Sequence, residues 1–276
     1  MKRRFAGVRR KTEFSPNHVG NDLRILSLTA DALAARGHEA DLFNEGEEIP
    51  GARNYDLIFS MAQGPEGNRL LRQYEAEGVR VINSPGSVLN CYRAMMVTRL
   101  PENGIPFPRS MVIATGSRSA SMSLALNSDK VWVKRGDVHA VHKEDVTLVY
   151  SESERRAVLE EFHQRGIGEA VLQEHLEGDT VKFYAVRDAD FFSWYYLNGV
   201  LHTPIDELRL TELAFASAEI LGLDIFGGDA IIGPSGSISI IDINDWPSFA
   251  PVREKASQCI AGLLIRKADG HDHHTR

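Results

Sequence analysis

The stretch that decides the fold is GGDAIIGPSGSISIIDINDWPSFAPVREKA, which runs from Gly227 to Ala256. Two apolar segments flank the turn sequence GPSGS, and this pattern predicts a β-hairpin. The second apolar segment, IIDIND, carries the polar residues Asp242, Asn244 and Asp245. Since an unpaired carboxylate in a buried strand is costly, these polar side chains need either a bound cation or a protein partner.

Strand alternation separates these side chains. Ile240, Asp242 and Asn244 are expected on one face, and Ile241 and Ile243 on the other. The hairpin would bring Asp229 beside Asp242, so that three oxygen donors (Asp229, Asp242 and Asn244) converge on one side of the sheet. Carboxylates that act together with substrate phosphates suit Mg²⁺, with Mn²⁺ as an alternative cation. The competing interpretation is that these residues cap turns or pair with arginine, which is the interpretation favoured for Asp245.

Composition sets broad limits on function. The 276 residues carry a net charge of −7, which argues against a generic nucleic-acid binder. No apolar run is long enough for a membrane span, and two distant cysteines without a CxxC motif indicate a reduced, cytoplasmic protein. The first twelve residues nevertheless hold six Lys and Arg and no acid, which allows a local anion site. A homodimer is compatible with all of this.

The first third of the chain alternates strand and helix. Strands are expected at FAGV, ADLF, YDLIFSMA and VRVINS, with a helix over Asn21 to Arg36 and another over Glu66 to Glu77. This rhythm predicts a small parallel sheet covered by helices, whose ligands bind beyond the carboxyl ends of the strands. The loop after the first strand is therefore a candidate substrate edge, with Arg9, Arg10, Lys11 and Asn17 as contacts.

The rest of the chain predicts an α/β protein built of α+β lobes. A helix is expected over Ser87 to Leu100, and long alternating strands such as TVKFYAV and FFSWYYL suit an antiparallel sheet. We expect a first domain over residues 1–85, a central lobe over 86–178, a C-terminal lobe with the metal site over 179–268, and a disordered tail over 269–276.

Two further segments suit nucleotide binding. Lys134 ends the apolar strand VWVKR and is followed by a glycine at position 136, so it can direct a cation at phosphate oxygens. The segment Gln173 to Asp179 lies where one strand ends and another sheet begins, and a hinge of this kind can line a purine pocket.

The order of these residues resembles the ATP-grasp superfamily, including its D-alanine–D-alanine ligase-like and RimK-like members. The resemblance covers roughly Ser84 to Ile265, and the N-terminal lobe looks like the preATP-grasp domain that usually precedes this fold. It implies that Arg93, Lys134 and Lys182 contact ATP phosphates. It also implies that Gln173, Glu174, His175 and Leu176 line the adenine site, that Asp179 contacts the ribose, and that Asp229, Asp242 and Asn244 hold Mg²⁺.

The chain departs from the family at several positions. Arg93 stands where members commonly have lysine, and the metal motif reads Asp-x-Asn where Glu-x-Asn is frequent. The loop after Lys134 has one glycine and contains His139 and His142, which resembles the inositol polyphosphate kinases, where a histidine at the position of His139 faces the substrate.

The resemblance therefore leaves three functions open, of which it favours the first. The first is a carboxylate–amine ligase that acts through an acyl phosphate, with Lys182, Arg93 and His139 as catalytic residues and a small-molecule acceptor still to be identified. The second is a small-molecule kinase of the inositol polyphosphate type, in which the basic residues of the N-terminal loop and His142 would serve a polyanion. The third is a protein that binds nucleotide without turnover.

Overall fold

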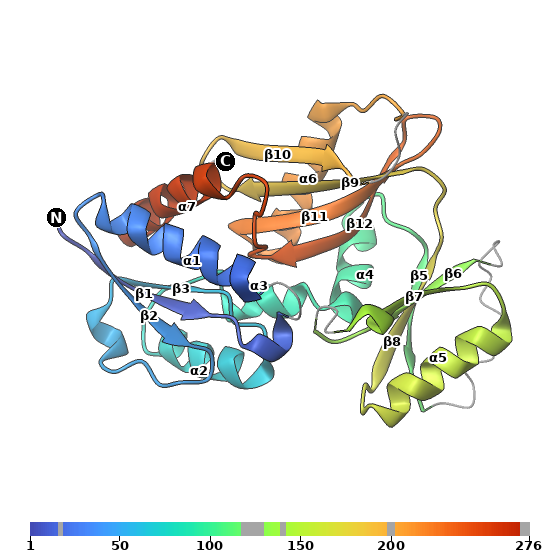
Figure 1. The fold of residues 1–276 in the computed structure, drawn as a ribbon, viewed down its shortest axis with the longest axis horizontal. Helices are drawn as coiled ribbons and strands as arrows, with labels where there is room; N and C mark the ends of the chain where they lie inside the picture. Colours follow the sequence, from blue (N-terminus) through green and yellow to red (C-terminus); the bar gives the residue numbers. More distant parts are fainter. Residues whose placement is uncertain (16–18, 117–129, 139–141, 198–201, 271–276) are drawn as a thin grey trace.

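A computed structural model describes residues 1–15, 19–116, 130–138, 142–197 and 202–270. Three sheets of four strands each make up the fold (Figure 1). The first sheet comes from the N-terminal third, the second from the middle of the chain, and the third from the C-terminal half.

The first sheet is parallel throughout, as the sequence predicts. Its strand order is β2-β1-β3-β4, formed by β1 (Arg4–Arg9), β2 (Glu39–Asn44), β3 (Leu57–Ser60) and β4 (Val81–Ile82). The connecting helices are α1 (Val19–Ala34) and α2 (Pro65–Ala76). The carboxyl ends of β1 and β3 turn toward the third sheet, which brings the loops after these strands close to the end of β12 (Ile238–Asp245).

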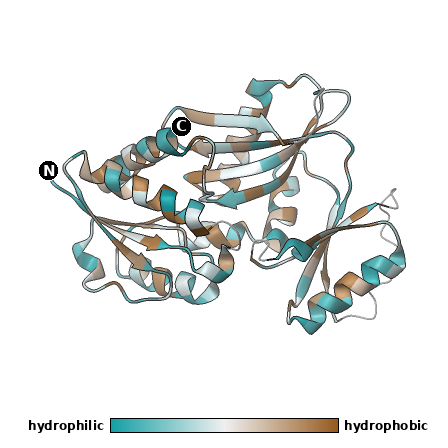
Figure 2. Ribbon diagram, in the orientation of Figure 1, coloured by the Kyte–Doolittle hydropathy of each residue, from teal (hydrophilic) through white to brown (hydrophobic). Residues whose placement is uncertain are grey.

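The second sheet is antiparallel, with the order β5-β8-β6-β7. Its elements are β5 (Ser110–Ala114), β6 (Val131–Arg135), β7 (Val146–Val149) and β8 (Glu169–Glu174). Helix α5 (Glu152–Gln164) buries Leu159 and Phe162 against this sheet and exposes charged residues on its outer side (Figure 2). The helix starts at Ser151, whose side chain accepts a hydrogen bond from the backbone of Glu154.

The third sheet is also antiparallel, with the order β10-β9-β11-β12. Its strands are β9 (Asp179–Val186), β10 (Phe191–Tyr196), β11 (Ile225–Ile232) and β12, and helix α6 (Glu207–Leu221) packs against them. The predicted hairpin is confirmed: β11 and β12 are joined by the turn at 233–237, closed by a 2.8 Å hydrogen bond from the Gly233 amide to the Ser237 carbonyl.

The helix expected over Ser87 to Leu100 is wrong in one respect, because two helices occupy this region. They are α3 (Pro85–Asn90) and α4 (Arg93–Glu102). Tyr92 interrupts them with an extended backbone (φ −60°, ψ 134°), and its hydroxyl donates to the carbonyl of Gln63 at 2.9 Å. This tertiary contact overrides the helical pattern and places Arg93 at the first position of α4.

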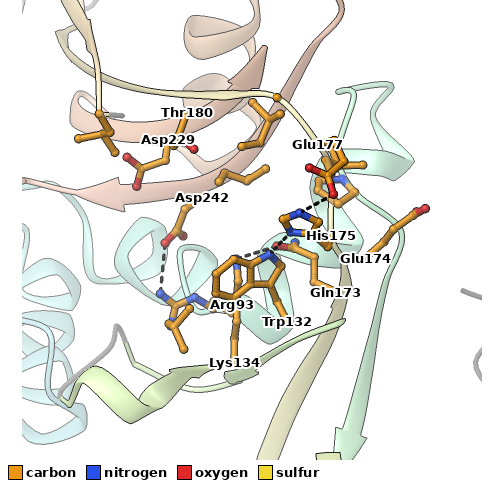
Figure 3. A pocket seen from close by; sticks show the side chains of 17 residues that line it. Arg93, Trp132, Lys134, Gln173, Glu174, His175, Glu177, Thr180, Asp229 and Asp242 are labelled. Carbon is orange, nitrogen blue, oxygen red and sulfur yellow. Dashed lines mark hydrogen bonds and ion pairs between the residues drawn. The ribbon is translucent and has the colours of Figure 1, made fainter. Parts of the chain in front are cut away.

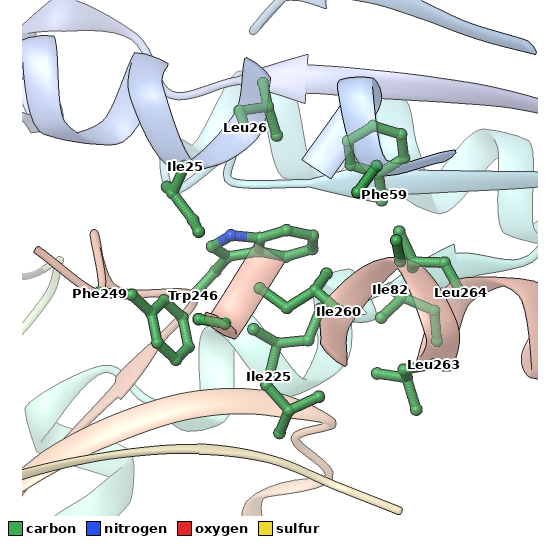
Figure 4. Close-up of a cluster of buried hydrophobic side chains, with 14 of the residues drawn as sticks. Ile25, Leu26, Phe59, Ile82, Ile225, Trp246, Phe249, Ile260, Leu263 and Leu264 are labelled. Atoms are coloured by element: carbon green, nitrogen blue, oxygen red, sulfur yellow. The ribbon is translucent and has the colours of Figure 1, made fainter. Parts of the chain in front are cut away.

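A single hydrophobic core joins the first and third sheets. Helix α7 (Arg253–Ala268) lies alongside α1 (Figure 1), and its apolar side packs with that of α1. Trp246, directly after β12, is fully buried at the centre of this core. Its indole stacks on Phe59 at 6.0 Å between ring centroids and lies between Ile25 and Ile260 in the close-up (Figure 4).

Candidate active site

A cavity of about 560 Å³ opens between the second and third sheets. Trp132, Lys134 and Gln173 enter it from the second sheet, whereas Asp229 and Asp242 enter it from the third (Figure 3). Arg93 reaches it from the start of α4, and the segment after β8 closes one end. The sequence-predicted nucleotide residues Arg93, Lys134, Gln173, Glu174, His175 and Leu176 all line this cavity.

Asp229 and Asp242 are direct cross-strand neighbours in the β11–β12 pair, as the hairpin predicts. The two backbones approach each other so closely there that a Cβ at position 228 would lie 2.5 Å from the carbonyl oxygen of Asp242, and glycine is needed at this position. A β-bulge follows, in which Ala230 pairs with Ile240 and Ile241 is the extra residue.

The bulge corrects the expected faces of β12. Ile240 is fully buried in the same apolar cluster as Ile243, whereas Ile241 lines the cavity beside Asp242. The expectation that Ile240 shares a face with Asp242 is therefore wrong, because the extra residue shifts the alternation by one position. The alternation resumes after the bulge, so that Asp242 and Asn244 are half-buried on either side of the buried Ile243.

Both cavity carboxylates lie against cations. The Lys182 ammonium donates to Asp229 Oδ1 at 2.9 Å and to Oδ2 at 3.2 Å. Arg93 Nη2 donates to Asp242 Oδ2 at 3.1 Å. Burial raises the pKa of Asp229, although the charge of Lys182 opposes this shift. Burial also disfavours the charge on Lys182, but attraction and hydrogen bonding to Asp229 outweigh it and raise the pKa of Lys182.

Lys134 has a different environment. The residue is 6% exposed, and its ammonium donates to Gln173 Oε1 at 2.6 Å. Burial lowers its pKa to about 8, with the nearby Arg93 charge adding to the effect and the carboxylates of Asp242 and Asp229 opposing it. The pocket thus holds a poorly solvated lysine that would gain from an anionic ligand.

The segment after β8 forms the apolar end of the cavity. Trp132, which the sequence reasoning did not select, donates its indole N–H to His175 Nδ1 at 3.1 Å. His175 Nε2 lies 3.4 Å from Glu177 Oε1, which in turn contacts Lys130 at 2.7 Å. Alternation along the VWVKR strand could have identified Trp132, since it lies two residues before Lys134 and therefore on the same face of that strand.

Asp179 does not line the cavity. Its carboxylate accepts a 2.7 Å hydrogen bond from the backbone N–H of Thr203, whereas the adjacent Gly178 and Thr180 are lining residues. Strand alternation turns Asp179 away, so the expected ribose contact is corrected. Glu177 is the carboxylate at this rim, and its side chain is 71% exposed.

A second cavity of about 460 Å³ lies between the third sheet and the loops of the first. Asn244 and Lys182 line it beside Tyr184 and Tyr195, so Asn244 faces this cavity while Asp242 faces the first one. Lys182 bonds to Asp229 of the first cavity and thus connects the two. This second space adjoins the candidate metal residues and is the candidate acceptor site.

Of the expected substrate contacts that the structure describes, Arg10 lines the second cavity and Arg9, Lys11 and His142 do not. Arg10 lines the second cavity, but it donates to Asp22 at 2.9 Å and to the backbone carbonyls of Met61, Asp245 and Trp246. Arg9 and Lys11 point to Asn44 and Glu13, and neither lines this cavity. His142 is exposed and caps the turn that ends at Asp145. Asn17 and His139 lie outside the described residues.

The specific partners of two buried carboxylates, Asp245 and Glu45, were not anticipated from the sequence. Asp245 is buried and accepts a 3.0 Å hydrogen bond from Gln63 Nε2, in agreement with its expected role as a partnered residue. Glu45 at the end of β2 accepts backbone hydrogen bonds from Lys11, Gln63 and Gly64, at 2.8, 3.0 and 2.5 Å. The loops that border the second cavity are therefore held in place by one buried carboxylate.

The residues at the β11–β12 pair fit Mg²⁺ bound together with phosphates. Within the described part of the chain, no cluster of three or more His, Cys, Asp or Glu side chains could hold a metal alone. Mg²⁺ in nucleotide sites, however, takes one or two carboxylates plus phosphate oxygens and waters. Asp229 and Asp242 offer that kind of donor set, whereas Asn244, the third expected ligand, lines the second cavity.

Comparisons with known proteins agree with this architecture. No family model matches the chain. A probable alpha-L-glutamate ligase of Enterobacter sp. is 23% identical over 222 residues, which is 74% of this chain and 72% of that protein. None of the helices in the described residues is long and apolar enough to cross a membrane.

The solved structures match over nearly the whole chain. A RimK domain ATP-grasp protein from Sphaerobacter thermophilus has a TM-score of 0.71 and 20% identity, and the match covers 95% of this chain and 99% of that one. The D-alanine–D-alanine ligase of Bacillus anthracis, solved with ATP, has a TM-score of 0.74 and 15% identity, with 98% and 100% covered. This chain therefore has the ATP-grasp fold, with a parallel α/β unit at its N-terminus.

Proposed function

We propose that this protein is a Mg²⁺- and ATP-dependent ligase that joins a carboxylate to an amine through an acyl phosphate. The observation that carries the proposal is that Asp229 and Asp242 face the cations Lys134 and Arg93 around one cavity, while Lys182 pairs with Asp229 from the neighbouring cavity. The ATP-dependent ligases with this fold, and the probable glutamate ligase among the sequence relatives, support it.

In this proposal the nucleobase lies at the segment from Gln173 to Gly178, against Trp132 and His175. The phosphates extend toward Lys134 and Arg93, whose buried cations would neutralise charge on the transferred phosphoryl group. Asp229, Asp242 and Asn244 would hold Mg²⁺, which when bound supplies further charge neutralisation at the phosphates. Lys182 lies between the two cavities, where the transferred group meets the acceptor.

The charge of the second cavity favours a ligase over a polyphosphate kinase. Of the described residues that line it, the cations are Arg10 and Lys182, and each is paired with an aspartate. A polyanionic acceptor would need several cations with free donors. Tyrosine, asparagine, glutamine and serine supply most of the other polar groups, which suits a small acceptor of low net charge.

A matrix of carboxylates and amines, assayed for both ADP and free phosphate, tests the proposal. The ligase releases ADP and phosphate only when a carboxylate and an amine are both present, because the amine displaces phosphate from the acyl phosphate. A kinase gives ADP and a phosphorylated product without free phosphate. Tight nucleotide binding without ADP release from any pair would identify a protein that binds nucleotide without turnover and would refute the ligase.

A further inference from the structure

The pairing of Arg93 with Asp242 differs from another largely buried arginine–aspartate pair, that of Arg10 with Asp22. The side chains of Arg93 and Asp242 are 7% and 14% exposed, and their contact of 3.1 Å is made through a single guanidinium nitrogen. Figure 3 shows the guanidinium below Asp242 and directed into the cavity.

The remaining donors of Arg93 are not satisfied. Its Nε and Nη1 atoms are buried and have no hydrogen-bond partner among the described residues. Buried donors without partners are costly, and native proteins seldom keep them without a reason. In a cavity that carries the candidate nucleotide residues, two unpaired donor nitrogens on one guanidinium can each donate a hydrogen bond to a phosphate oxygen.

Arg10 provides the contrast. It is buried to a similar degree, with a side chain 9% exposed, and pairs with Asp22 at 2.9 Å. Its Nε and Nη2 nitrogens, however, donate to three backbone carbonyls, those of Met61, Asp245 and Trp246. Arg10 therefore has the hydrogen bonds of a structural arginine, whereas Arg93, a residue that lines the first cavity, has two donor nitrogens without a partner among the described residues.

We infer that Arg93 competes with a divalent cation for the Asp242 carboxylate until a nucleotide phosphate accepts hydrogen bonds from the free donors of Arg93. This competition, and its release by phosphate, is called the latch below. This inference rests on the proposed function, since it assigns the cavity to Mg²⁺ and ATP. The guanidinium and a metal ion are both attracted to the Asp242 carboxylate, so each weakens the binding of the other. A phosphate on Nε and Nη1 neutralises the guanidinium and removes that competition.

The latch makes metal and nucleotide binding mutually favourable, by the same factor in each direction. It also gives a reason for arginine at this position, because a guanidinium can contact a carboxylate and a phosphate through different nitrogens at the same time. A lysine ammonium is a single point charge and cannot divide its donors in this planar way. Lys182 forms the corresponding pair with Asp229.

Mn²⁺ binding, measured by electron paramagnetic resonance, tests the latch without any need for turnover. In wild-type protein, Mn²⁺ alone should bind weakly, and a saturating non-hydrolysable ATP analogue should tighten its binding. Arg93→Gln should tighten the binding of Mn²⁺ alone by about tenfold, the effect of removing one cation beside a carboxylate. Lys130→Gln is the matched control, because it removes an exposed cation that contacts Glu177 and neither carboxylate of the candidate metal site, and it should leave Mn²⁺ binding unchanged.

Arg93→Lys keeps the charge and loses the fork. It should leave Mn²⁺ alone weakly bound and reduce the tightening produced by the ATP analogue, and this variant decides the matter if Arg93→Gln does not fold. Unchanged Mn²⁺ affinity in a folded Arg93→Gln protein, or full tightening in Arg93→Lys, would overturn the latch. If the latch behaves as expected and the substrate matrix gives no ADP, the ligase proposal fails while the latch stands.

Discussion

Nucleotide binding should weaken as the pH rises above 8, because the Lys134 ammonium loses its proton there. Burial lowers the pKa of this lysine from 10.5 to about 8, and each pKa unit corresponds to 1.36 kcal/mol. Relative to water, the site therefore destabilises the charged form of Lys134 by about 3 kcal/mol. A phosphate beside Lys134 would return much of this energy by favouring the charged form.

The direction of this pH dependence follows from the protonation state of Lys134 that binds phosphate, which is the ammonium. Below pH 8 Lys134 is already protonated, so the affinity for nucleotide should be flat in this range. Above pH 8 the free protein must take up a proton as it binds phosphate, so the affinity should fall by up to about tenfold per pH unit. The raised pKa of Lys182 keeps that second cation charged throughout, and the last phosphate ionisation, near pH 6, is complete.

Isothermal titration calorimetry with Mg²⁺ and a non-hydrolysable ATP analogue measures this dependence directly. Titrations from about pH 7 to about pH 9.5, in buffers of different ionisation enthalpy, report both the dissociation constant and the number of protons taken up. Lys134→Arg should remove the pH dependence, because arginine keeps its charge over the whole range. A flat dissociation constant and no proton uptake in the wild-type protein would refute the role assigned to Lys134.

Three other variants probe the metal residues, the shared core and the link between the sheets. Asp242→Ala should abolish turnover while circular dichroism stays native, and near-normal activity in the folded variant would remove Asp242 from the metal site. Trp246→Ala should lower the free energy of unfolding by about 3–5 kcal/mol in denaturant titrations, because the fully buried indole fills the core between the first and third sheets. Arg10→Gln should also destabilise the protein, by about 3–5 kcal/mol, since it leaves the buried Asp22 without its cation. Nucleotide affinity should change little in this last variant, and normal stability combined with impaired acceptor use would restore Arg10 as a substrate contact.

Local patterns in the sequence were sufficient for most of the elements and for the nucleotide end of the site. Helix α5 (Glu152–Gln164) and the hairpin around GPSGS depend on neighbouring residues, through capping and turn chemistry. The convergence of Asp229 with Asp242 follows from the same hairpin. For this reason the candidate metal pair could be predicted without knowledge of the rest of the fold.

The errors arise where distant segments meet. The break at Tyr92 depends on the carbonyl of Gln63, and the face of Ile240 depends on a bulge in the register with β11. Asp179 is directed to Thr203 by the pairing of its strand, and the donors of Arg10 are taken by carbonyls from β12 and the loop after β3. Apart from the bulge, which lies within the β11–β12 hairpin, none of these partners lies close in sequence to the residue that it affects.

The sequence by itself therefore determined the alternation of elements, the hairpin and the set of oxygen donors on it, because each depends on interactions within a few residues. The tertiary structure alone decided which cations meet those donors. Arg93 and Asp242 are 149 residues apart, and their contact exists because α4 and β12 pack from different parts of the chain. The same packing pairs Arg10 with its carbonyl partners and leaves two nitrogens of Arg93 for a ligand.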